Sequence, residues 1–147
     1  MKITTTPKTL MISTDKETYT HWLVDMNLRF YDSGNVMWSH IEMASIARRS
    51  RDYIKGLVIG CRAFVGIKHP KPRISMEGDS LMVAGYILGF RNRVPFFTSG
   101  SECISLDQAA GLFGVTTQLL QGVAEGARSM AGHKKKGLLD KKDDAKV

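Results

Sequence analysis

The sequence predicts an α+β fold, in which a helix separates the first strands of a single, mostly antiparallel sheet and a C-terminal helix packs on that sheet. Three patterns predict this fold. Apolar and polar side chains alternate over residues 22–30 and 57–68, as they do in half-buried strands. Apolar residues between 37 and 54 recur at helical spacing. Ser105 and Gln108 have the spacing of a capping box, which opens a helix.

Length and composition predict one domain with an extension at each end. The chain has 147 residues, and a hydrophobic content of 43% is enough to build a buried core. We expect a flexible arm over residues 1–18, a globular domain over residues 19–131 and a disordered lysine-rich tail over residues 132–147. No apolar run approaches the roughly 18 residues of a membrane-spanning helix, and the N-terminus lacks a signal-peptide core. We therefore expect neither secretion by that route nor integration into a membrane.

The first half of the chain predicts strands followed by a helix. An apolar burst at Leu10-Met11-Ile12 fits either an edge strand or a segment that docks on another subunit. Every even-numbered residue from Trp22 to Phe30 is apolar, which predicts a strand over that range. A turn at residues 32–35 ends this strand, and the helical spacing that follows predicts a helix that stops near Gly56.

The middle of the chain predicts a strand, a loop and a hairpin. The alternation from Leu57 to Lys68 predicts a strand with one face in the core. Two prolines in residues 69–73 remove donors from any sheet ladder, so we expect an exposed basic loop there. A hairpin then runs through residues 74–77, a turn at Gly78-Asp79 and a strand from Leu81 to Phe90.

The last part of the chain predicts a loop and a C-terminal helix. Residues 92–100 form the expected loop, and their apolar patch Val94-Pro95-Phe96-Phe97 must fold back or meet a partner. The helix begins after Ser105, but it contains several glycines that each cost up to about 1 kcal/mol relative to alanine. It therefore needs tertiary support or consists of two pieces.

The residues that could support catalysis do not form a recognisable site. The four histidines, His21, His40, His69 and His133, have no metal-ligand spacing. Cys61 and Cys103 form neither a metal motif nor a disulfide framework, and their apolar surroundings predict reduced, buried thiols. We therefore predict no metal, no cofactor and no catalytic activity, although an enzyme whose site assembles only in the fold remains an alternative.

Basic residues are the main functional signal. The formal net charge of +7 favours an anionic partner, such as nucleic acid, an acidic membrane leaflet or an acidic protein. Cations at a helix C-terminus also stabilise the helix dipole, and a solvated surface explains any single cluster, but several clusters together favour a partner. Three clusters are present, besides the pair Arg91 and Arg93: Arg48, Arg49, Arg51 and Lys55 at the expected helix end, Lys68, Lys71 and Arg73 in the proline-rich loop, and Lys134, Lys135 and Lys136 in the tail.

Four short elements lie between about Trp22 and Phe90: Ile46-Ala47, Asp52-Tyr53-Ile54 with Gly56, Arg62-Ala63-Phe64-Val65-Gly66 and Met76-Glu77-Gly78. Together they resemble the core of rhabdovirus matrix proteins. The resemblance implies a small α+β protein that self-associates and bridges the helical ribonucleoprotein to the inner leaflet of the viral envelope, within the virion and in the host cytoplasm during infection. The chain is short for that family, and it has no Pro-Pro-x-Tyr motif and only a sparse N-terminal arm.

On this interpretation, the three basic clusters contact the viral nucleoprotein–RNA complex or an anionic membrane leaflet. Contacts between copies, which form an open-ended homo-oligomer, come from Leu10, Met11, Ile12, Val94, Pro95, Phe96 and Phe97. The alternative is a small basic viral or phage accessory protein that binds RNA or DNA directly, although the sequence shows no aromatic stacking platform at a recognised spacing.

Overall fold

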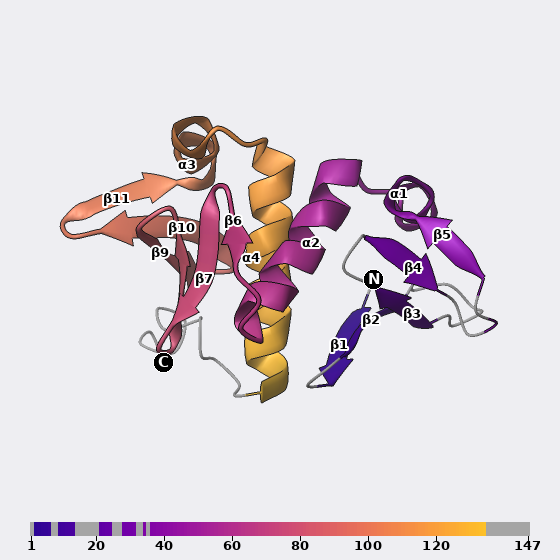
Figure 1. The fold of residues 1–147 in the computed structure, drawn as a ribbon. Coiled ribbons are helices and arrows are strands. Elements are labelled where there is room, and N and C mark those ends of the chain that lie inside the picture. Colours follow the sequence, from indigo (N-terminus) through magenta and orange to yellow (C-terminus); the bar gives the residue numbers. More distant parts are fainter. Residues whose placement is uncertain are drawn as a thin grey trace.

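The strands form two antiparallel sheets, and a pair of helices lies between them (Figure 1). The computed structural model describes residues 2–6, 9–13, 21–24, 28–31, 34 and 36–134. The predicted α+β class is confirmed, with antiparallel strands, a helical segment between early and later strands, and a C-terminal helix packed on the sheet. In one respect the expectation is corrected, because the strands divide between two sheets instead of one.

The first sheet has five strands that pair in chain order. Within residues 1–18, which were predicted to be a flexible arm, residues 2–6 form strand β1 and residues 9–13 form strand β2. Strand β2 pairs with β1 on one side and with β3, residues 21–24, on the other, so it is not an edge strand. The single strand predicted over residues 22–30 is wrong, because Leu23 pairs with Tyr31 across a hairpin. Its strands are β1 (Lys2–Thr6), β2 (Thr9–Ser13), β3 (His21–Val24), β4 (Arg29–Tyr31) and β5 (Met37–Ser39).

Two helices follow this sheet, α1 (His40–Ala47) and α2 (Arg51–Phe64). Ser39 begins α1 through a capping box with Glu42, and the Ser50 hydroxyl caps α2 by accepting a hydrogen bond from the Tyr53 amide. The predicted helix stop near Gly56 and the predicted strand over residues 57–68 are therefore wrong. Most of α2 is buried on several sides at once, so its apolar run does not mark the single buried face of a strand.

The α2 helix packs along α4 (Thr117–Lys134) at backbone contact. A Cβ atom on Gly56 would overlap the carbonyl oxygen of Leu119, and one on Gly122 would overlap that of Tyr53. Because Gly126 meets Leu57 and Cys61 one turn further along both helices, the two helices run in the same direction (Figure 1). Glycine at these contacts allows the two backbones to approach closely.

The second sheet is a six-stranded meander that covers one side of the helix pair (Figure 1). Turns at Ala84-Gly85 and Asn92-Arg93 have positive φ at both residues, as two-residue hairpins require. The predicted hairpin from residue 74 is confirmed, whereas the long strand to Phe90 is divided at Ala84-Gly85 and the predicted loop over residues 92–100 contains a strand. The strands are β6 (His69–Pro70), β7 (Arg73–Glu77), β8 (Ser80–Val83), β9 (Tyr86–Arg91), β10 (Val94–Ser99) and β11 (Glu102–Ser105).

The C-terminal helical region is divided, which confirms one of the two predicted outcomes. The Ser105–Gln108 capping box begins α3 (Leu106–Phe113), which ends at Gly114 with φ 73°. The Thr116 hydroxyl then accepts a hydrogen bond from the Leu119 amide at the start of α4. None of the described helices is both long enough and apolar enough to span a membrane.

The core lies between the helices and the inner face of the second sheet. Alternate residues of the strands point toward the helices and are fully or almost fully buried. These are Ile74, Leu81, Val83, Leu88, Phe90 and Phe97. The first turns of α2 and α4 lie at the edge of this core, and the functional candidates lie around them.

Candidate anion-binding surfaces

The N-terminal ends of α2 and α4 lie side by side because the two helices are parallel. The Thr116 hydroxyl, immediately before α4, donates a hydrogen bond of 2.8 Å to the Asp52 carboxylate in the first turn of α2. This bond joins the two helix ends across 64 residues of sequence. Helix N-termini carry partial positive charge, so the Asp52 carboxylate lies where both helix dipoles favour an anion.

A cavity of about 300 Å³ opens at this end of the helix pair. We call it the arginine cavity. One wall comes from the segment that joins α1 to α2, and the other comes from the first two turns of α4. Its lining residues are Arg48, Arg49, Ser50, Tyr53, Thr117, Gln118 and Gln121.

A network of side chains supports one wall of the arginine cavity. The Arg49 guanidinium carbon lies 3.5 Å from the centre of the Tyr53 ring. The Tyr53 hydroxyl donates to Glu125 Oε1, and Gln121 Nε2 donates to Glu125 Oε2 at 2.6 Å. Burial, followed by the hydrogen bond to Glu125, raises the pKa of Tyr53, so its hydroxyl stays protonated and remains a donor.

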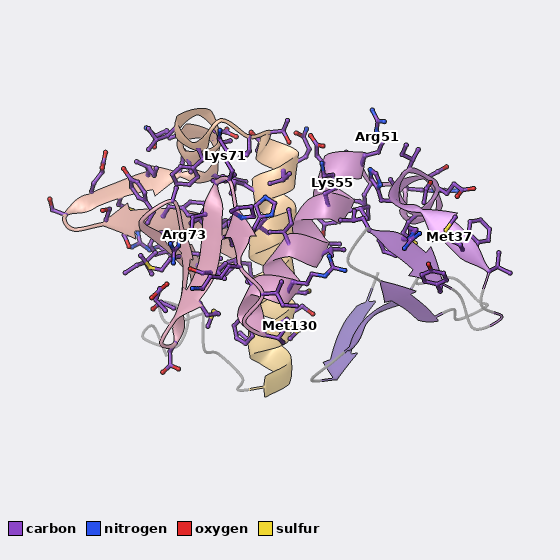
Figure 2. The ribbon with its side chains drawn as sticks, viewed as in Figure 1. Met37, Arg51, Lys55, Lys71, Arg73 and Met130 are labelled. Atoms are coloured by element: carbon purple, nitrogen blue, oxygen red, sulfur yellow. The ribbon has the colours of Figure 1, made fainter. Side chains whose placement is uncertain are left out.

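A second group of cations, which we call the basic ridge, consists of Arg51 and Lys55 on α2 and Lys71 in the β6–β7 turn. Arg51 and Lys55 are one turn apart on α2, while Lys71 lies in the turn between β6 and β7 (Figure 2). In the part of the chain that the structure describes, none of these three side chains has an acidic partner. Among the described residues, therefore, no carboxylate forms an ion pair with them, although Asp52 follows Arg51 in α2.

The charges of the basic ridge contribute to the pKa shifts of two histidines, His40 and His69. Burial lowers the pKa of His40, and the nearby charges of Lys55 and Arg51 lower it further, against an opposing effect of Asp52. Burial also lowers the pKa of His69; a hydrogen bond with the Lys71 main chain opposes this, and the charge of Lys55 adds to the lowering. Lys55 therefore lies close enough to act on side chains from α1 and from β6.

The structure changes the interpretation of the basic cluster at residues 48–55. These residues do not follow one helix, because α1 ends at Ala47 and α2 begins at Arg51. Arg51 is thus the first residue of α2, where the helix dipole opposes a cation, and Lys55 lies one turn later, where the dipole does not attract one. The structural explanation that the sequence offered for Arg51 and Lys55, stabilisation of a helix C-terminus, is wrong.

The remaining predicted basic residues lie apart from each other. Lys68 and Arg73 are exposed on either side of the β6–β7 turn. Lys134 is the last residue of α4, and its side chain is not among the described parts. Lys135 and Lys136 lie outside the described residues.

The residues predicted to mediate self-association do not form one patch. In β10, Pro95 and Phe97 face the core, while Val94 is 61% exposed and Phe96 is partly exposed on the outer face of the sheet. The expectation of a continuous apolar loop is corrected, because a strand sends alternate side chains to opposite faces. Leu10, Met11 and Ile12 lie in β2, and their side chains are outside the described structure.

The cysteines differ from each other. Cys61 is buried, its thiol donates to the carbonyl of Gly126, and burial raises its pKa to about 12. Cys103 is exposed, so the prediction of a buried thiol at that position is wrong. Within the described ranges, no group of three or more His, Cys, Asp or Glu side chains is placed to hold a metal ion.

Comparison of the chain with models of protein families, with curated proteins and with solved structures finds no match. Function is therefore inferred from the arginine cavity, the basic ridge and their surroundings.

Proposed function

We propose that the protein is a non-enzymatic structural protein that binds a phosphate-rich partner through the basic ridge. One observation carries this proposal: Arg51 and Lys55 occupy the N-terminal turns of α2 with no acidic partner in the described structure. A cation near a helix N-terminus is unfavourable by roughly 0.3–1 kcal/mol. Cations that the fold does not use are available to the phosphates of a partner.

We propose further that this role is of the matrix type. The partner is then the viral nucleoprotein–RNA complex, the second contact is the anionic inner leaflet of the envelope, and copies self-associate between the two in an open-ended array. Support comes from the resemblance to rhabdovirus matrix proteins and from the exposed apolar side chains of Ile87 and Val94 on the outer face of the second sheet. The protein would act beneath the envelope in the virion and in the host cytoplasm.

Analytical ultracentrifugation tests both parts of this proposal. The protein is sedimented over a range of protein and salt concentrations, alone, with RNA and with phosphatidylserine vesicles. We expect species of increasing size when RNA or vesicles are added, and we expect Arg51→Glu/Lys55→Glu to lose that effect. A monomer at all salt concentrations that binds neither RNA nor vesicles contradicts the proposal.

A second candidate function is direct binding of single-stranded nucleic acid on the outer face of the second sheet. The Arg91 guanidinium carbon lies 5.2 Å from the centre of the Phe96 ring, and the Phe96 ring covers Gly89 on the neighbouring strand. An aromatic ring beside an arginine is a common platform for stacked bases. Loss of RNA binding in Arg91→Gln/Phe96→Ala, with the ridge intact, would favour this candidate.

A further inference from the structure

We propose that the arginine cavity binds a single phosphate group, such as the terminal phosphate of a phosphomonoester. The cavity and the basic ridge consist of different residues, so this inference does not depend on the proposed function. Its strongest support is the chemistry of the lining. No carboxylate lines the cavity, and five of its seven lining residues, Arg48, Arg49, Ser50, Gln118 and Gln121, retain a side-chain hydrogen that the structure shows in no bond. The hydroxyls of Tyr53 and Thr117 already donate to Glu125 and Asp107.

The charges at the cavity select for an anion. Arg48 and Arg49 both line it, and arginine is the residue best suited to phosphate because its guanidinium offers several donors in one plane. Arg48 has no acidic partner among the described residues. Arg49 stacks its guanidinium on the Tyr53 ring, and stacking uses the face of the group while leaving the donors at its edge.

Part of the cavity wall is ordered before any ligand arrives. Glu125 is not part of the lining, but it accepts hydrogen bonds from both Tyr53 and Gln121 and so holds these two side chains at the wall. The parallel ends of α2 and α4, helices of 14 and 18 residues, add their positive dipole potential to the cavity. Preorganised donors reduce the cost of ordering side chains on binding.

The size of the cavity limits the ligand. About 300 Å³ is at the lower end of the volumes found for small-molecule sites, so the cavity suits one phosphate group with a small substituent. A polymer would bind it only through an end or a side group. The cavity and the basic ridge therefore differ in the ligands that they can accept, because the ridge lies on an open surface.

The test is a titration of the isotope-labelled protein with inorganic phosphate, followed by amide chemical shifts in NMR spectra at constant ionic strength. We expect saturable shifts at Ser50, Gln118 and Gln121, and no saturation when chloride replaces phosphate. Shifts that do not saturate, or that are confined to Arg51, Lys55 and Lys71, overturn the inference. The outcome is independent of RNA or vesicle binding by the ridge.

Two charge-matched variants complete the test. Arg48→Gln removes one cation from the cavity, and Arg93→Gln removes one from the β9–β10 turn. We expect Arg48→Gln to weaken phosphate binding about tenfold, as expected for the loss of one charge-assisted hydrogen bond, with Arg93→Gln unchanged. Equal affinities in the two variants overturn the inference. Gln118→Leu, which leaves the net charge unchanged, should also weaken binding.

Two sources could supply the phosphate group, and a vesicle experiment distinguishes them. Phosphatidylcholine vesicles with and without phosphatidic acid are sedimented with the wild-type protein and with Arg48→Gln. Recruitment that requires phosphatidic acid and Arg48, and that inorganic phosphate reverses, assigns the cavity to a lipid headgroup. Saturable binding of inorganic phosphate without such recruitment assigns it to a soluble phosphate ligand.

Discussion

Lys55 connects parts of the molecule that are distant in sequence. Its ammonium group is close enough to His40 in α1 and to His69 in β6 to lower the pKa of both imidazoles. A lysine at the centre of a positive surface makes each neighbouring protonation less favourable. Burial is the larger cause of both pKa shifts, and the charge of Lys55 adds to it at each histidine.

We predict that Lys55→Gln raises the pKa of both His40 and His69. In the wild-type protein both values should lie below the ordinary 6.5. Near that pH the folded state then binds fewer protons than the unfolded state. The stabilisation from keeping the two imidazoles neutral is therefore complete above pH 6.5, and it is lost as the pH falls toward the pKa values of the folded state. NMR titration of the imidazole protons gives the two pKa values, and Arg93→Gln is the control. A response of only one histidine would show that Lys55 does not join α1 and β6 into one surface.

Residue-level chemistry was only partly predictable from the sequence. The capping pair Ser105 and Gln108 was recognised because its signal is local. The arginine cavity was missed because its two walls lie more than 60 residues apart. The local signal for the cavity was the pair Arg48 and Arg49 beside Ser50, which caps α2. Ser50 can act as a cap only if a helix begins after it, whereas the sequence pattern predicted one continuous helix through this residue.

At the scale of elements, the α2–α4 contact is the most constrained part of the fold. Glycines four residues apart recur on both helices, at Gly56 and Gly60 and at Gly122 and Gly126. This spacing places each pair on one helix face and permits backbone contact. From sequence, Gly122 and Gly126 are among the glycines that predict a weak C-terminal helix, whereas Gly56 predicts the end of an earlier helix. Their cost in helix propensity is offset by the packing that they permit.

We predict that Gly122→Ala destabilises the protein strongly. Its Cβ would overlap the Tyr53 carbonyl oxygen and lie 2.8 Å from the Leu57 amide nitrogen, both of which are main-chain atoms. Overpacking of this kind costs typically about 1–3 kcal/mol of unfolding free energy. Gly111→Ala in α3 is the matched control, because its Cβ would meet no atom within 4 Å. That variant should be neutral or more stable by up to about 1 kcal/mol.

Urea denaturation of the two glycine variants provides the measurement. Equal stability of Gly122→Ala and Gly111→Ala would contradict the close contact between α2 and α4. A large loss in the first variant alone supports it.

The largest error of sequence interpretation also belongs to α2. Residues 57–68 alternate well enough to predict a strand, yet residues up to Phe64 are helical. A short, continuously apolar run does not distinguish a buried strand from a buried helix. The helix forms because α4 on one side and sheet residues on the other bury it, and this tertiary arrangement leaves no signature in the local pattern.

At the scale of the whole molecule, one sheet lies on either side of the helix pair (Figure 1). The sequence predicted the α+β class because strand and helix periods are local properties. The division into two sheets depends on which strands pair, and pairing is decided by contacts that are distant in sequence. The basic character of the surface was likewise predictable, while its separation into a ridge and a cavity depends on where α1 ends and α2 begins.

The measurement that tests the central claim most directly is the salt dependence of RNA affinity, followed by fluorescence anisotropy of a labelled single strand. Arg51→Gln/Lys55→Gln is compared with Arg91→Gln/Arg93→Gln, which removes the same charge from the second sheet. Each lost phosphate contact reduces the slope of log affinity against log salt by about 0.7. We therefore predict a slope shallower by about 1.4 for the ridge variant and an unchanged slope for the sheet variant. The opposite pattern, or equal slopes in both variants, would contradict the claim that the ridge binds the phosphate-rich partner.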